Sequence, residues 1–148
     1  AGHVAGKVIP ILQSIGFEVT VIDIRPPEMV MERVKQADHF INAKTFENGL
    51  SQIQDSPETY YLSCAYTHQL DLDIMRLLLQ KKHCYIGMLG SEAKITKIRT
   101  ILSNEGIPKE ILDTVHMPVG LPIGGKTPEE IAVSIAAEVI QVKTRRRG

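Results

Sequence analysis

The first residues of the chain have the types and the spacing of a phosphate-binding loop. Gly2 and Gly6 stand where the second and third glycines of a G-x-G-x-x-G motif belong, and the first glycine is absent. The second glycine lets the backbone approach a phosphate, and the third lets the following helix pack closely against a strand. The helix N-terminus offers N–H groups and a partial positive charge to an anion. The sequence therefore predicts an anion site at Gly2, His3 and Gly6.

An acidic residue follows this loop at the distance expected for a ribose-binding acid. The β-rich run 17–23 ends at Asp23, 21 residues after Gly2. In a Rossmann βαβ unit an acid at this position accepts hydrogen bonds from a ribose diol. The alternative is that Asp23 is a turn residue at the end of a strand. Arg25 either meets a phosphate or is solvated.

Two further polar clusters each follow a predicted strand. They are Thr67, His68 and Asp71, after the run 59–65, and Gly90, Ser91 and Lys94, after the run 83–90. Ligands of parallel sheets bind beyond the carboxyl ends of the strands, so we expect these clusters to line the same crevice as the first loop. The alternative for Asp71 is a carboxylate favoured by a helix dipole, and for Ser91 a helix cap.

Two histidines would face one another across that crevice. His3 and His68 could act as an acid and a base, or bind a metal, and a hydrogen-bonded loop residue is the alternative for each. The sequence has no closely spaced set of His, Cys and Asp ligands, so we predict no metal site. No residue is identified as catalytic.

Hydrophobic periodicity indicates the elements that would position these residues. Helices are predicted over 3–15, 28–36, 46–53, 71–81, 92–104, 107–114 and 128–142, and strands over 17–23, 38–42, 59–65 and 83–90. Strands that alternate with helices predict a Rossmann-like α/β fold, with a doubly wound, mostly parallel sheet in three α/β/α layers. The strand that should precede Gly2 is missing, so we expect 1–148 to be one domain of a longer protein.

The segment 120–127 matches the P-loop pattern G-x-x-x-x-G-K-[ST] letter for letter. Pro122 removes a backbone donor from the cradle, and no convincing strand precedes the segment. Thr127, Pro128 and Glu130 instead have the order of a helix cap, a first helical residue and a capping-box partner. We therefore predict a helix start here and no nucleoside triphosphatase.

Composition excludes several classes of partner. The chain of 148 residues is 43% hydrophobic and carries 17 basic and 17 acidic side chains. This balance argues against nucleic-acid and membrane binding by bulk charge, and the basic tail 143–147 is interpreted as a solvated helix end. Cys64 and Cys84 lie in apolar runs, which favours buried thiols in a reducing compartment. No signal peptide or membrane span is predicted, which favours a cytoplasmic protein.

The motifs at 1–4, 21–26, 67–71, 87–94 and 125–138 together resemble the C-terminal Rossmann domain of the XdhC/CoxI family. These are accessory proteins of molybdenum hydroxylases such as xanthine dehydrogenase. The resemblance implies a cofactor-binding chaperone rather than a catalyst, which binds molybdenum cofactor (molybdopterin), assists its sulfuration and inserts it into the apoenzyme. It implies as partners the hydroxylase apoenzyme, a cysteine desulfurase and a second copy of the chain. It also implies a crevice lined by Gly2, His3, Gly6, Asp23, Thr67, His68, Gly90, Ser91 and Lys94.

Two other classes of function are kept open by the residues. The glycine loop and Asp23 would also suit an NAD(P)-dependent oxidoreductase, although the chain offers no substrate domain. A nucleotide-sensing regulatory domain, in which ligand binding shifts an oligomer, is the other alternative.

Overall fold

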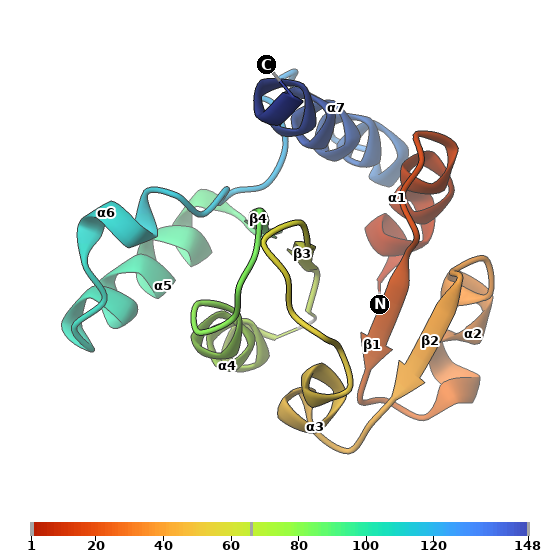
Figure 1. The fold of residues 1–148 in the computed structure, drawn as a ribbon, viewed down its shortest axis with the longest axis horizontal. Coiled ribbons are helices and arrows are strands. Elements are labelled where there is room, and N and C mark those ends of the chain that lie inside the picture. The colour runs from red at the N-terminus through yellow and green to blue at the C-terminus, as the bar shows by residue number, and fades with distance from the viewer. Residues whose placement is uncertain (1, 66, 148) are drawn as a thin grey trace. The chain divides into compact units, whose positions relative to one another are not determined.

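The computed structural model describes residues 2–65 and 67–147, with the side chains of His68 and Arg147 left undescribed. The chain divides into two compact units. Unit 1 is Ala1–Gln54 with Gly120–Gly148, and unit 2 is Asp55–Val119. In the described residues strands alternate with helices and pair in parallel, as predicted from the sequence (Figure 1).

Unit 1 combines a two-stranded sheet with four helices. Its elements are α1 (His3–Ser14), β1 (Thr20–Asp23), α2 (Pro27–Val34), β2 (His39–Asn42), α3 (Phe46–Ser51) and α7 (Pro128–Arg147). β1 and β2 run parallel in Figure 1, with Thr20 beside His39 and Asp23 beside Asn42. The α1 helix tolerates Pro10 in its interior and ends ahead of Gly16, which has a φ of 99°.

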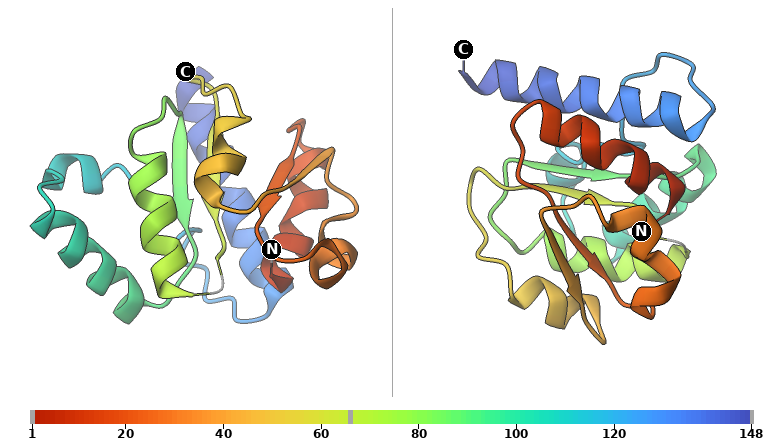
Figure 2. Two further views of the ribbon diagram at one scale, coloured as in Figure 1. Left: turned by 90° about the horizontal axis from the view of Figure 1, so that it is seen from below. Right: turned by 90° about the vertical axis from the view of Figure 1, so that its right-hand side faces the viewer.

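The most extensive contact of unit 1 is made by α1 and α7, which lie side by side (Figure 2, right). Lys7 pairs with Glu129 at 3.6 Å near both N-termini. Lys143 donates to the Ile15 carbonyl at 3.0 Å near both C-termini, so the two helices run parallel. The buried apolar residues of the helices in this unit include Val8, Ile9, Val30, Val34, Ala132, Ile135 and Val139.

Unit 2 holds the second sheet. Its elements are β3 (Tyr60–Ser63), α4 (His68–Leu78), β4 (Tyr85–Met88), α5 (Glu92–Asn104) and α6 (Lys109–Leu112). β3 pairs in parallel with β4, with Ser63 beside Met88. His116 continues the sheet beyond β4, because its N–H donates to the Ile86 carbonyl at 2.8 Å and its carbonyl accepts from Met88 at 2.9 Å. All four residues of β4 are buried, as expected for a strand covered on both faces.

Some predicted boundaries were wrong. The α4 helix begins at His68 rather than at 71, because the Thr67 hydroxyl caps it by accepting from the Leu70 N–H at 3.2 Å. The α7 helix continues to Arg147, so the basic tail is its last part. The strands are shorter than predicted, and each described strand has four residues. The expectations of a strand before Gly2 and of a longer protein stay predictions.

Gly120 leads into the segment that docks on α7. It has a φ of 100°, and its N–H donates to the Glu138 carboxylate at 3.1 Å. A Cβ at Gly120 would lie 2.5 Å from the Ser134 hydroxyl oxygen. Gly106, at the end of α5, has a similar φ of 97°, but a Cβ there would meet nothing within 4 Å. Both glycines have a positive φ that disfavours other residues, but only Gly120 also lacks the space for a Cβ.

This difference predicts unequal costs for the same substitution. Gly106→Ala should lower the free energy of unfolding by about 1 to 2 kcal/mol, the cost of a left-handed alanine. Gly120→Ala should lower it by at least about 1 kcal/mol more, because Ser134 must move to relieve the overlap. Urea denaturation of both variants measures the difference, and equal losses would contradict the packing argument.

Candidate anion-binding site

The N-terminus of α1 is the best candidate for an anion site in unit 1. Gly2 is the N-cap, and space is open around it, because a Cβ at Gly2 would meet nothing within 4 Å. Within the described residues no side chain caps this helix, and its first turn contains no acidic residue. The partial positive charge of the helix end is therefore not neutralised by an acid of its own first turn.

Four of the other helices in the described residues have a side-chain oxygen as N-cap. Thr45, Thr67, Ser91 and Thr127 each accept a hydrogen bond from the backbone as N-caps of α3, α4, α5 and α7. The α2 and α6 helices have no side-chain cap but carry Glu28 and Glu110 in their first turns. Among the helices that the structure describes, α1 alone has neither feature, which leaves it suited to an external anion.

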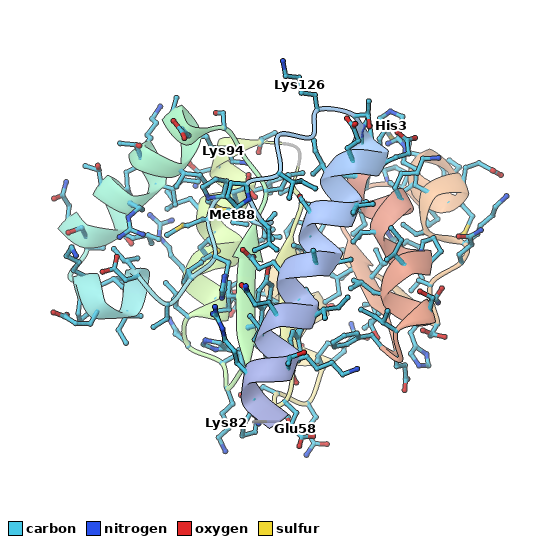
Figure 3. All side chains as sticks on the ribbon, turned by 90° about the horizontal axis from the view of Figure 1, so that it is seen from above. His3, Glu58, Lys82, Met88, Lys94 and Lys126 are labelled. Atoms are coloured by element: carbon cyan, nitrogen blue, oxygen red, sulfur yellow. The ribbon has the colours of Figure 1, made fainter. Side chains whose placement is uncertain are left out.

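Basic groups stand beside this helix end. The Arg33 guanidinium of α2 lies 3.4 Å from the Nε2 atom of His3. A Cβ at Gly6 would lie 3.1 Å from the Arg33 carbonyl oxygen. Gly6 thus allows a close approach, and within the described residues the element that it approaches is α2. Figure 3 shows His3 and Lys126 at the same end of the α1 and α7 pair.

Asp23, the predicted ribose acid, is engaged by its own neighbour. Its side chain is 1% exposed, and both carboxylate oxygens accept from the Arg25 guanidinium, at 3.2 and 3.0 Å. The Arg25 N–H donates to the same carboxylate at 2.9 Å. Burial raises the pKa of Asp23, but the hydrogen bonds from Arg25 oppose burial and contribute to lowering that pKa to about 2. A ribose diol would have to displace Arg25 to reach this carboxylate.

A buried charge cluster links the elements of unit 2 at the carboxyl end of its strands. Asp71 of α4 is fully buried, and its Oδ1 accepts from the Ser63 hydroxyl of β3 at 3.0 Å. Its Oδ2 forms an ion pair with the Lys94 ammonium. Lys94 also donates to the Leu89 carbonyl at 2.9 Å. Figure 3 shows Lys94 toward the Met88 end of β4, with Glu58 and Lys82 toward the opposite end.

The turn at Gly90 and Ser91 holds Lys94 in this position. A Cβ at Gly90 would lie 2.8 Å from Lys94 Cδ, so glycine leaves room for the lysine stem. The Ser91 hydroxyl accepts from the Lys94 N–H at 3.2 Å and caps α5, as the sequence predicted. Lys94, which was expected to line the ligand crevice, is therefore neutralised by Asp71, and a ligand would have to compete with that carboxylate.

Cys64 follows Ser63 at the end of β3 and carries a thiol of low reactivity. Burial raises the pKa of Cys64 to about 12, and the nearby Asp71 carboxylate also acts to raise it. The thiol therefore stays protonated at neutral pH. Both cysteines are free, and both are partly exposed, whereas buried thiols were predicted.

The segment that resembles a P-loop is filled by the chain itself. One carboxylate oxygen of Glu130 accepts from the N–H groups of Lys126 and Thr127, both at 3.1 Å. The Thr127 hydroxyl accepts from the Glu130 N–H at 3.1 Å, which completes the predicted capping box. The N–H groups that would cradle a phosphate are thus satisfied by Glu130.

Two further sequence-based hypotheses concern a metal site and a pair of histidines. No group of three or more His, Cys, Asp or Glu side chains in the described part could hold a metal ion. The pairing of His3 with His68 stays a prediction, because the His68 side chain lies outside the described residues.

The sequence analysis missed Ser63 and Arg33. A lone serine at the end of the apolar run 60–62 was the available signal for Ser63, whereas nothing in the sequence links Arg33 to His3.

Comparison with known proteins decides the family. A model described as the XdhC Rossmann domain matches residues 1–139. The chain belongs to this family. The XdhC domain is 36% identical, over 130 residues, to a Bacillus subtilis (strain 168) protein named as a probable xanthine dehydrogenase subunit, and this match covers 88% of the chain and 37% of the relative. None of the helices in the described residues is long and apolar enough to cross a membrane.

Two further relatives agree with this assignment. The "Uncharacterized protein YqeB" of Escherichia coli K12 is 28% identical over 148 residues, which cover 100% of the chain and 27% of that protein. A crystal structure described as a xanthine dehydrogenase from Bacillus halodurans superposes with a TM-score of 0.82 at 31% identity, over 98% of this chain and 41% of that one. The XdhC domain thus spans only 27% to 41% of the length of these relatives.

The buried ion pair of unit 2 predicts a large cost for removing one partner. Lys94→Met should lower the free energy of unfolding by about 3 to 5 kcal/mol, because Asp71 is left buried without a counter-charge. The double variant Asp71→Asn with Lys94→Met should recover much of this loss. Lys35→Met, which breaks the exposed pair with Glu32, should cost less than about 1 kcal/mol. Urea denaturation that gave equal losses at Lys94 and Lys35 would refute the assignment.

The Asp23 pair predicts a dependence of stability on pH. The folded pKa of about 2 lies below the ordinary value of 3.8, so this carboxylate stabilises the fold above pH 3.8, and the contribution is lost as the pH falls toward 2. Arg25→Gln should therefore destabilise the chain at neutral pH, and its difference from the parent should shrink below pH 3.8. Unfolding measured at a series of pH values checks this, and a difference independent of pH would speak against it.

Proposed function

We propose that the XdhC domain belongs to an accessory factor that binds molybdenum cofactor, assists its sulfuration and inserts it into a xanthine dehydrogenase-type hydroxylase. The observation that carries the proposal is the family match over residues 1–139. The names of the relatives from Bacillus subtilis and Bacillus halodurans, which refer to xanthine dehydrogenase, support a role linked to that enzyme.

The residues at the start of α1 fit the anionic part of such a cofactor. Molybdenum cofactor carries a phosphate or nucleotide tail on a flat pterin ring. The α1 N-terminus provides a glycine N-cap with open space around it and no acid in its first turn, beside His3 and Arg33. These groups would hold the phosphate, since helix N-termini and guanidinium groups both favour it. When bound, the cofactor supplies the molybdenum centre with which the hydroxylase oxidises its substrate.

The proposal gives sulfur donation to a partner, because Cys64 is poorly suited to it. A sulfur donor needs a thiolate at neutral pH, and Cys64 has a pKa raised to about 12. Within the proposal the sulfur therefore comes from a cysteine desulfurase, and this domain holds the acceptor. The role assigned to it is that of a maturation factor that binds and positions its cargo.

The NAD(P) alternative has less support from the residues. Its best candidate, Asp23, is 1% exposed and has both oxygens bonded to Arg25. A nicotinamide dinucleotide would need this carboxylate for its ribose diol. The proposal therefore places the pterin cofactor ahead of NAD(P) as the ligand.

A titration of the purified protein distinguishes these ligands. Molybdenum cofactor should bind more tightly than NAD or NADP. His3→Glu should raise its dissociation constant about tenfold or more, because the new carboxylate takes the place of the anion at α1. Lys126→Gln removes a positive charge beside α7, whose N-terminus Glu130 already fills, and it should change binding less than about twofold. Binding of NAD or NADP in place of the pterin cofactor would overturn the proposal.

A further inference from the structure

The carboxylate that this fold would offer to a ribose diol is covered by a neighbouring residue of the chain. Asp23 ends β1 and is buried. Three donors of Arg25 converge on its two oxygens: the backbone N–H at 2.9 Å, Nε at 3.2 Å and a terminal guanidinium nitrogen at 3.0 Å. A ribose diol would bring two hydroxyl donors to the same two oxygens. Arg25 therefore takes the place of a ribose from within the chain.

The turn that carries Arg25 is fixed by the residues around it. The Asn42 carboxamide, at the end of β2, donates to the Arg25 carbonyl at 2.6 Å and to the Asp23 carbonyl at 3.1 Å. Pro26 and Pro27 follow, and α2 begins at Pro27. Because proline restricts φ, the chain leaves Arg25 along a defined path. The Arg25 side chain is 17% exposed, so it is held in the turn and does not extend into solvent.

The ion pair of Asp23 with Arg25 joins no separate elements of the fold. The two residues are two positions apart in one turn, and β1 is tied to β2 by the sheet and by Asn42. Arg76 and Glu105, by contrast, join α4 to the residue that follows α5, and both are 38% exposed. Burying an ion pair carries a desolvation cost. A buried pair that connects no elements, at the position of a ribose acid, favours a role in ligand selection.

We propose that Arg25 determines ligand specificity by excluding nucleotides that bind through a free ribose diol. The guanidinium holds both oxygens of Asp23, so the hydroxyls of such a nucleotide lack their acceptor. A phosphate at the α1 N-terminus does not need this carboxylate. Removal of the guanidinium uncovers an acceptor for the diol and creates a preference for ribonucleotides. The proposal does not depend on molybdenum cofactor as the cargo of the domain.

Calorimetric titration with AMP and with deoxy-AMP tests this role. The two nucleotides differ only in the 2′-hydroxyl, so the ratio of their dissociation constants reports recognition of the diol and not of the phosphate or base. The parent chain should bind both equally. Arg25→Gln should bind AMP about tenfold more tightly than deoxy-AMP, because a hydroxyl can then donate to the Asp23 carboxylate. Arg76→Gln, which removes a guanidinium of unit 2, is the matched control and should show no preference.

Two further variants separate ligand selection from a loss of folding. Asp23→Asn combined with Arg25→Gln removes the carboxylate, and it should bind AMP and deoxy-AMP equally. Arg25→Lys keeps the positive charge but cannot reproduce the forked contact, so it should show a smaller preference for AMP even if Arg25→Gln does not fold. A parent that already prefers AMP, folded Arg25 variants without a preference, or a preference that persists in the double variant would each overturn the proposal.

Discussion

Each helix N-terminus leaves backbone N–H groups that need an acceptor, and this chain meets that need with its own side chains almost everywhere. Threonine or serine caps four of its described helices, and a glutamate stands in the first turn of two more. The α1 helix is the exception within the described residues. Its glycine N-cap leaves the positive end of the helix open, which makes this helix end the candidate site for an external anion.

The other polar clusters are weaker candidates for a ligand site, because their charges and N–H groups already have partners within the chain. Lys94 is neutralised by Asp71, Asp23 by Arg25, and the amides of the P-loop-like segment by Glu130. A ligand at any of these places would have to displace a buried or hydrogen-bonded partner, whose desolvation has already been compensated within the chain. These contacts instead fix the ends of strands and helices. In unit 2 the Asp71 contacts join β3, α4 and α5 at one point.

Local features of the fold were predictable from the sequence, and long-range contacts were not. The capping box at Thr127 and the cap at Ser91 follow from residues within one helical turn, and both are confirmed. The ion pair of Asp71 with Lys94 joins residues on different helices, and no sequence pattern specifies such a pairing. The close approach at Gly6 was expected, but its neighbour α2 was not. A glycine in a sequence can indicate a tight contact, but it does not indicate which element makes that contact.

The accessory role itself is tested most directly by the molybdenum content of the hydroxylase in cells that lack this protein. The hydroxylase should accumulate as a polypeptide with little molybdenum and little activity. The wild-type gene should restore both, whereas the His3→Glu variant should restore neither. A hydroxylase with full molybdenum content and full activity in the absence of the protein would contradict the proposed function.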